Sequence, residues 1–369
     1  IVGSNEIRNL LIKENSQITY TVSQETNFGI NEANYLIKKY FQIASLEGIG
    51  LKNLKNKIIM KGGFVNAHAH LDRANTATFF SKEEQYKFLK EKWKLVDKIK
   101  KESRQLDYKM RISKALGDQL LFGVSSVCSF IDLDTTVGSK AIDAALELSN
   151  EDMVAKRIDF VMATQTLKGV ISPEEQRLLA QNVEKVHIIG SLPGADKGFE
   201  ALHLDVVMGW AKTYKKRLHV HVDQLNTSAE KETELLARKT MEWGLEDRVT
   251  AVHSISLACH PKHYREEVYK MSKDAGLSFV TCPSAWIDHP RREDLAPIHN
   301  SITPVDELIQ HDLVVAIGSD NIYDVYKPYS DGDMMFELRM LLEACKKYDE
   351  DILAEIATTN GRKVIGLHD

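Results

Sequence analysis

Short runs of apolar residues alternate with longer charged segments along most of the chain. Eight of these runs are typical of buried β-strands, at 62–68, 123–131, 159–165, 185–191, 217–223, 248–254, 277–283 and 313–319. Amphipathic stretches of helical period separate them, for example TSAEKETELLARKTMEWGL after the fifth run. Repeated strand–helix units on this scale predict an α/β protein with the (β/α)₈ architecture of a TIM barrel. A doubly wound open sheet is the alternative, but no GxGxxG motif follows the first strand.

The first 61 residues have a different pattern. NLLI and ITYTVS predict short strands, and NEANYLIKKYFQI predicts a helix. We therefore expect residues 1–61 to form a small N-terminal β-rich flanking segment, part of a small β-sandwich, and residues 62–369 to form the barrel. Two helices are predicted after the eighth strand, at 333–347 and 350–359. The charged segment 82–117 is expected to be one long helix whose outer face is solvated.

Composition narrows the class of protein. Of the 369 residues, 43% are hydrophobic and 27% are charged, as in ordinary globular chains. The net charge is -5 and the basic residues are interspersed with acids, so we expect no nucleic-acid partner. The apolar runs are too short to cross a bilayer, so no membrane association is expected. The oligomeric state stays open, with a homo-oligomer among the options.

The four cysteines are scattered without CxxC spacing, which favours a reducing compartment. A cytoplasmic location is therefore expected. Because the chain begins at Ile1 and not at a methionine, the possibility that a leader peptide was removed stays open.

Polar residues follow several predicted strands at their C-terminal ends, and this is the active face of such a barrel. The residues in question are His68, His70, His219, His221, His253 and Asp320. One His-x-His pair arises easily by chance among 13 histidines, but two pairs at strand ends do not. Since strand side chains alternate between faces, His68 and His70 point the same way. A set of unrelated buried histidines explains this arrangement less well than a shared site.

Neutral imidazoles and a carboxylate make a site for one divalent metal ion, Zn²⁺ or Fe²⁺. An open position on such an ion holds a water whose pKa falls towards neutrality, which gives hydroxide at physiological pH. An aspartate beside that water can take up its proton as a general base. The sequence therefore predicts a metal-dependent hydrolytic site that acts on a small-molecule substrate.

Four segments together resemble the motifs of the amidohydrolase superfamily, and within it the cytosine-deaminase-like group. They are GFVNAHAHLD, HVHVDQ, VHS and GSDNIYDVYKP, in that order, and the likeness runs from about Gly62 to the end of the chain. The resemblance implies that the metal ligands are His68, His70, His221 and Asp320. It also implies that Asp320 is the base and that His253 contacts the metal-bound water or the substrate oxygen.

The resemblance further implies substrate contacts. Gln165 would read the amide edge of the substrate, Asn321 stands where relatives have a second acid, and Tyr326 would line the pocket. The long segment 283–300 after the seventh strand is expected to act as a lid, with Trp286 as a candidate substrate contact.

Some related barrels hold two metals bridged by a lysine on the fourth strand. The fourth strand here ends IIGSLPG without a lysine at its tip, so we expect a mononuclear site. His219 is expected to be a buried packing residue and not a ligand.

Deaminases of this group carry a glutamate three residues after the fifth-strand histidine, where this chain has Gln224. An amide can donate a hydrogen bond but cannot cycle a proton near neutral pH. The neighbouring Asp223 is expected to turn to the other side of the chain.

The leading hypothesis is therefore a hydrolase that cleaves a C–N bond of a small, nitrogenous, cyclic compound. It would use a metal-bound hydroxide, Asp320 as base, and Gln224 as a hydrogen-bonding group in the catalytic site. One alternative is a deaminase of a pyrimidine- or triazine-like ring. The other is a non-catalytic relative that binds a small molecule.

Overall fold

The computed structural model describes residues 49–151, 155–287 and 301–367, together with short strands within the first 29 residues. The chain divides into two compact units, Ile1–Lys57 and Ile58–Asp369.

In the first unit, β1 (Glu6–Ile7) pairs with β4 (Phe28–Gly29), and β2 (Leu11–Glu14) pairs with β3 (Gln17–Thr21), both antiparallel. The predicted strands NLLI and ITYTVS correspond to β2 and β3. The predicted helix NEANYLIKKYFQI lies outside the described residues, and the β-sandwich stays a prediction. A helix that was not predicted, α2 (Ile49–Met60), precedes the first barrel strand along the chain.

The second unit contains one sheet of eight parallel strands in chain order. They are β5 (Phe64–Ala69), β6 (Val124–Asp132), β7 (Asp159–Gln165), β8 (Ile188–Ser191), β9 (Arg217–Val222), β10 (Val249–His253), β11 (Ser278–Thr281) and β12 (Val314–Ile317). A bridge between Ala69 and Asp320 joins the two edges of the sheet. The predicted (β/α)₈ barrel is confirmed, and each predicted strand is present.

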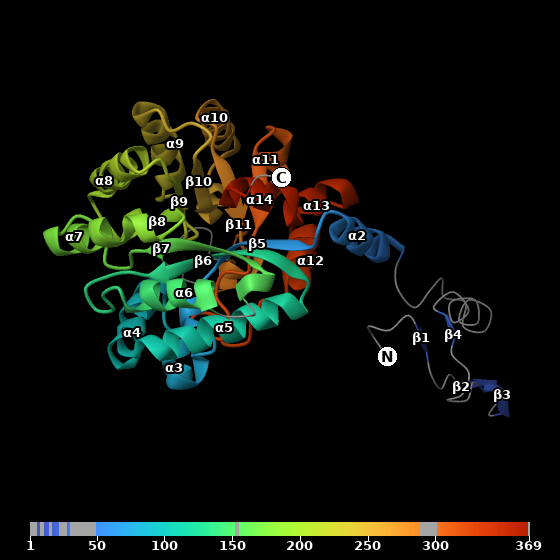
Figure 1. The fold of residues 1–369 in the computed structure, drawn as a ribbon. Helices are drawn as coiled ribbons and strands as arrows, with labels where there is room; N and C mark the ends of the chain where they lie inside the picture. Colours follow the sequence, from blue (N-terminus) through green and yellow to red (C-terminus); the bar gives the residue numbers. More distant parts are fainter. Residues whose placement is uncertain are drawn as a thin grey trace. The chain divides into compact units, whose positions relative to one another are not determined.

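Helices follow the strands and surround them on the outside (Figure 1). They are α3 (Lys82–Gln85), α4 (Leu89–Glu102), α5 (Gln105–Leu121), α6 (Lys140–Glu151), α7 (Pro173–Asn182), α8 (Glu200–Thr213), α9 (Glu232–Trp243), α10 (Lys262–Asp274), α11 (Val305–Gln310), α12 (Met334–Cys345), α13 (Glu350–Ala357) and α14 (Thr359–Ile365). The predicted helices at 333–347 and 350–359 correspond to α12 and α13.

The prediction of one solvated helix over 82–117 is wrong. The segment forms α3, α4 and most of α5, because Ser103 and Arg104 adopt extended conformations between α4 and α5. Nor is α4 simply an outer surface. Lys92 and Lys100 are each only 1% exposed, and the Lys100 ammonium forms ion pairs with the carboxylates of Asp132 and Asp134.

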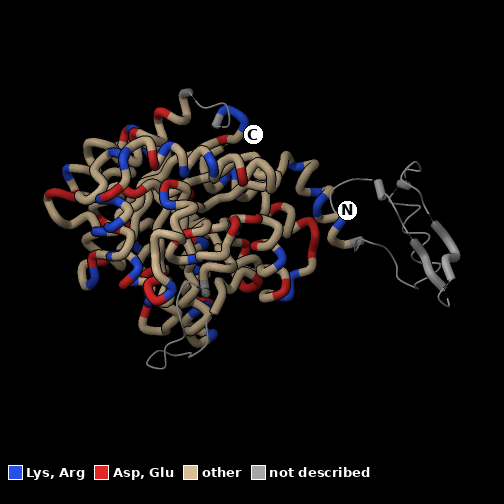
Figure 2. The backbone as a smooth tube through the Cα atoms, turned by 90° about the horizontal axis from the view of Figure 1, so that it is seen from below, with Lys and Arg blue, Asp and Glu red and all other residues tan. Residues whose placement is uncertain are grey.

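The charges on the barrel unit are mixed in sign. Figure 2 shows lysines and arginines interspersed with acids along its backbone, without a face of one sign in that view. Among the described residues, no helix combines the length and the apolar character needed to span a membrane.

Candidate metal centre

Four histidines and one aspartate meet at the carboxyl ends of the barrel strands. His68 comes from β5 and His70 directly follows it, His221 comes from β9 and His253 from β10, and Asp320 follows β12. The potential ligand atoms of His68, His70 and His221 lie within 4.8 Å of one another, and so do those of His68, His253 and Asp320. Each of the five residues is at most 4% exposed. The structure therefore brings together the residues that were predicted from the sequence to form one site.

The main chain fixes Asp320 against β5. Its N–H donates to the carbonyl oxygen of His68 at 2.9 Å, and the N–H of His70 donates to the carbonyl oxygen of Asp320 at 3.3 Å. Asp320 has a φ of 59°, which turns the chain as it leaves β12. The approach also requires Gly318, because a Cβ there would lie 2.7 Å from the carbonyl oxygen of His68. As a result, the Oδ1 atom of Asp320 lies 3.3 Å from Nε2 of His68 and 3.2 Å from Nε2 of His70.

The two histidines of β9 differ in their surroundings. His221 places its Nδ1 3.2 Å from the carbonyl oxygen of Ser191 at the end of β8, and its Nε2 has no partner. His219, two residues earlier, hydrogen-bonds through Nε2 to the carbonyl oxygen of Val364 at 3.1 Å. A histidine that ligates a metal through one nitrogen commonly donates its other N–H to such an oxygen. His221 therefore has the environment of a metal ligand, whereas His219 is hydrogen-bonded to the main chain of α14.

Several buried imidazole nitrogens lack a hydrogen-bond partner. Within the cluster they are both ring nitrogens of His68, Nδ1 of His70, Nε2 of His221 and Nδ1 of His253, and outside it Nδ1 of His219 also lacks a partner. A buried polar atom without a partner costs about 1–3 kcal/mol. A cation bound within this group would satisfy several of these atoms at once, so the residues present fit a divalent metal ion.

The protonation states suit the same role. Burial lowers the pKa of His68, His70 and His221, and lowers that of His253 to about 3. These imidazoles are therefore neutral at pH 7, which is the form that binds metals. Burial raises the pKa of the Asp320 carboxyl, but the contacts from His68 and His70 outweigh it and hold that pKa well below its usual range.

A small pocket of about 20 Å³ borders this group. It is lined by His70, His221, His253 and Asp320, by Gln224, which was predicted to belong to the catalytic site, and by three residues that the sequence predicted to contact substrate, Gln165, Asn321 and Tyr326. The side chain of the fourth predicted contact, Trp286, lies outside the described part of the structure, as do residues 288–300 of the predicted lid.

The predicted substrate contacts are not equally free to bind a ligand. The Oε1 atom of Gln165 is buried without a hydrogen-bond partner. Asn321 instead donates from Nδ2 to Oδ2 of Asp324 at 2.5 Å. Gln165 is therefore available to accept a hydrogen bond from a ligand, whereas the amide of Asn321 is partly committed to the protein.

Asp223 points away from the pocket, as strand alternation predicted. Its carboxylate accepts hydrogen bonds from the N–H groups of Glu232 and Thr233 at the start of α9, at 2.8 and 3.1 Å. The neighbouring Gln224 does line the pocket. Of these two residues, only the glutamine can meet a ligand beside the histidines.

Sequence reasoning missed five residues of the pocket wall, Arg73, Leu89, Trp93, Leu167 and Leu192. Arg73 is 4% exposed, and its guanidinium lies 3.2 Å from the Asp132 carboxylate. Its position directly after the first-strand motif could have indicated that Arg73 lies near the site. Leu89 and Trp93 belong to α4, and an amphipathic pattern does not tell which end of a barrel a helix covers.

Lys327 was also missed. Its buried Nζ donates to the carbonyl oxygen of Ser319 at 2.5 Å and to the Ser284 hydroxyl at 2.7 Å. The Glu337 carboxylate lies 3.9 Å from this ammonium. Because Ser319 directly precedes Asp320, these contacts support the backbone that carries the candidate base.

Known proteins share the sequence pattern and the fold. The Amidohydrolase family profile Amidohydro_3 matches residues 80–369. An uncharacterized protein of Haemophilus influenzae is 40% identical over 270 residues, which cover 69% of this chain and 94% of that protein. The N-isopropylammelide isopropyl amidohydrolase of Pseudomonas sp. (strain ADP) is 26% identical over 342 residues, or 88% of this chain and 79% of that protein.

Among solved structures, the 5-methylcytosine deaminase of Klebsiella pneumoniae liganded with 5-fluorocytosine superposes with a TM-score of 0.77 at 24% identity. The match covers 83% of this chain and 75% of that one, and it shows a common fold. A separate short match, 75% identical over 75 residues, is to the DNA mismatch repair protein MutS of Prochlorococcus marinus. It covers 20% of this chain and only 8% of MutS, so no property of MutS follows from it.

Proposed function

The chain belongs to the amidohydrolase family, hydrolases of C–N bonds other than peptide bonds, and within it we propose hydrolysis of a small, cyclic, nitrogenous compound with one divalent metal ion. The observation that carries this proposal is the set of partnerless, buried imidazole nitrogens gathered around the Asp320 carboxylate.

His68, His70, His221 and Asp320 would hold the ion, which would be Zn²⁺ or Fe²⁺. When bound, such an ion acts as a Lewis acid and lowers the pKa of a coordinated water towards neutrality. The end of β8 supports a single ion, because the residue there is Ser191, which offers no side-chain amine to bridge a second one.

Asp320 would act as the base. Its carboxylate is ionised at neutral pH and sits at the pocket that a substrate would enter. It would accept a proton from the attacking water and return it to the leaving nitrogen. His253 would donate a hydrogen bond to the substrate oxygen, and Lys327 would hold the backbone beside Asp320 in place.

Gln165, Gln224, Asn321 and Tyr326 would position the substrate, with Trp286 as a further contact. The Gln165 Oε1 would accept from a ring or amide N–H, because it is buried and lacks a protein partner. Gln224 would donate or accept a hydrogen bond but would not carry a proton. This favours hydrolysis of an amide, imide or ureide bond, in which Asp320 alone can protonate the leaving nitrogen.

The second candidate is hydrolysis of an exocyclic C–N bond on a pyrimidine- or triazine-like ring. It is favoured by the 26% identical relative, whose name gives N-isopropylammelide as the compound it acts on. In this case ring protonation would need a group other than Gln224.

Incubation of the metal-loaded protein with two sets of compounds tests the proposal. The first set contains cyclic imides and ureides such as hydantoin and dihydrouracil, and the second contains cytosine, 5-fluorocytosine and ammelide. Mass spectrometry would detect ring-opened acids, and an ammonia assay would detect deamination. We expect ring-opened products that the Asp320→Asn variant does not form. Ammonia release without ring opening would support the second candidate, and no product from either set would contradict both.

A further inference from the structure

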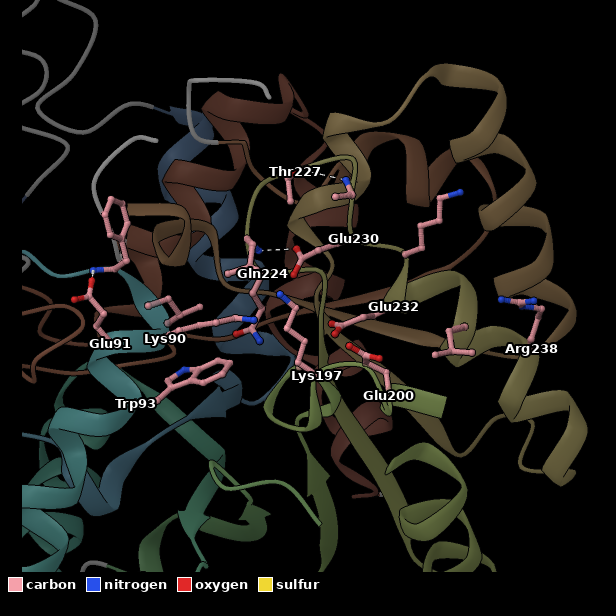
Figure 3. Close-up of a pocket in the computed structure, with 17 residues that line it drawn as sticks. Lys90, Glu91, Trp93, Lys197, Glu200, Gln224, Thr227, Glu230, Glu232 and Arg238 are labelled. Carbon is pink, nitrogen blue, oxygen red and sulfur yellow. Dashed lines mark hydrogen bonds between the residues drawn. The ribbon is translucent and has the colours of Figure 1, made fainter. Parts of the chain in front are cut away.

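A second, larger chamber opens beside the metal pocket. It has a volume of about 820 Å³, within the range of small-molecule sites, whereas the metal pocket of about 20 Å³ has room for about one water. The two spaces share Leu89, Trp93 and Gln224 in their walls. The two spaces are therefore adjacent, and Figure 3 shows the residues that line the outer one.

Three segments form the outer chamber. They are the start of α4 from Phe88, the turn that leads into α8 with Lys197 and Glu200, and the β9–α9 loop from Gln224 into α9. The indole of Trp93 and the side chain of Leu89 supply apolar surface where the two spaces meet.

The acids of the outer chamber are already engaged by the protein. Each of the four accepts a hydrogen bond from a main-chain N–H: Glu91 from Phe88, Glu200 from Gly198, Glu230 from Leu225 and Glu232 from Asp223, at 3.1, 2.9, 2.6 and 3.0 Å. Burial raises the pKa of Glu230 to about 7 and raises that of Glu232 well above its usual value. Main-chain hydrogen bonds therefore hold all four carboxylates in place.

Three lysines line the same chamber, Lys90, Lys197 and Lys231, and the first two lie near Gln224. Lys90 comes from α4 and Lys197 from the turn before α8, and Figure 3 shows both ammonium groups pointing toward Gln224. Among the described residues, neither ammonium forms a hydrogen bond or an ion pair with a carboxylate. Lys90 does lie over the Trp93 ring, 5.8 Å from its centroid. Beside the entrance to the metal pocket, the chamber thus presents two ammonium groups that have no directly bonded carboxylate among the described residues, although Lys90 lies near enough to Glu230 to lower the pKa of that carboxyl.

We infer that the outer chamber binds an anionic arm of the substrate, a carboxylate, through the ammonium groups of Lys90 and Lys197. The inference rests on the proposed function and narrows it to acidic compounds, in which a short chain joins the hydrolysed ring to the carboxylate. The chain would pass Trp93 and Leu89, which suit an apolar linker. Neither lysine touches the reacting bond, so both act on substrate binding and not on the chemical step.

A matched pair of probes tests the inference, hydantoin-5-acetate and its neutral analogue hydantoin-5-acetamide. Their dissociation constants would be measured by calorimetry on the zinc-loaded protein at low and high salt. We expect the acid to bind about tenfold more tightly than the amide at low salt, because two partly exposed charge pairs contribute about 1–2 kcal/mol together. The preference should shrink at high salt.

The Lys90→Met/Lys197→Met double variant should lose the preference, so that the two dissociation constants become nearly equal. Lys94→Met is the matched control, because Lys94 lies on the same helix, is exposed and does not line the chamber. Equal affinities in the wild-type protein, a preference that survives in the double variant, or no binding of either probe would each overturn the inference.

Failure of the inference and failure of the proposed function have different signatures. Hydrolysis of neutral hydantoin without a preference for the acid overturns the anionic arm alone. A lysine-dependent preference for the acid in binding, without hydrolysis of any compound, supports the chamber and contradicts the proposed reaction.

Discussion

The main-chain N–H of Asp320 donates to the carbonyl oxygen of His68 at 2.9 Å, although the two residues are 252 positions apart in the sequence. This bond lies where the last barrel strand meets the first, so closure of the barrel itself sets the position of the Asp320 carboxylate. The candidate base and the first histidine are therefore placed by the fold and not by a mobile loop.

Asp320→Asn should lower kcat by about 10²–10⁴-fold, since an amide cannot take up the proton of the attacking water. The near-isosteric side chain preserves the fold, which circular dichroism would check. Asp312→Asn is the control, because Asp312 is an exposed residue on the turn before β12. An Asp320→Asn enzyme with kcat close to that of the control would remove Asp320 from the mechanism.

His221→Ala and His219→Ala should differ in metal content, although the two residues lie on one strand. The first removes a proposed ligand, whereas the second removes a side chain that is hydrogen-bonded to the Val364 carbonyl. After dialysis against a weak chelator, we expect wild-type metal content in His219→Ala and a large loss in His221→Ala. Equal metal content in the two variants, measured by elemental analysis, would contradict the assignment of ligands.

Stability should fall as the pH drops below about 6.5, and His219 should contribute to that fall. Burial lowers its pKa from 6.5 to about 3, so below pH 6.5 the unfolded chain binds a proton that the folded chain refuses. One such group costs about 1.4 kcal/mol of unfolding free energy per pH unit between these values. Urea denaturation of metal-free wild-type and His219→Gln proteins at pH 7 and pH 5 would measure it. The variant should lose less stability than the wild type over this range, and identical losses would refute the attribution to His219.

Gln224→Glu should raise ammonia release from cytosine by about tenfold or more, because a carboxyl group can carry the proton that the ring nitrogen needs. The rate of hydrolysis of a cyclic ureide should change little, since Asp320 protonates its leaving nitrogen. Parallel assays on cytosine and hydantoin would separate the two effects. If neither rate responded, Gln224 would not determine the type of reaction.

Much of the barrel could be predicted from the sequence because each strand is a compact apolar run between helical segments. The histidines of β5 and β9 could be placed for the same reason, since alternation and strand ends fix where such side chains point. The direction expected for Asp223 agrees with its bonds to the start of α9, although Asp223 follows β9 and has a φ of 55°, so strand alternation is not its cause.

Other features could not be read from the pattern. The position of α4 depends on tertiary contacts, among them the burial of the Lys100 ammonium between Asp132 and Asp134. The closeness of Gly318 to His68 depends on barrel closure, which joins residues from opposite ends of the barrel unit. The lack of a directly bonded carboxylate at Lys90 and Lys197 depends on tertiary contacts, because main-chain N–H groups bind the neighbouring acids.

The central claim is that His68, His70, His221 and Asp320 bind one catalytic metal ion. Anomalous diffraction from crystals of the zinc-loaded protein, recorded on both sides of the zinc absorption edge, tests it most directly. The account predicts a single peak per chain within bonding distance of ligand atoms from these four residues. A peak elsewhere in the molecule, two peaks within the site, or no peak in fully loaded crystals would contradict it.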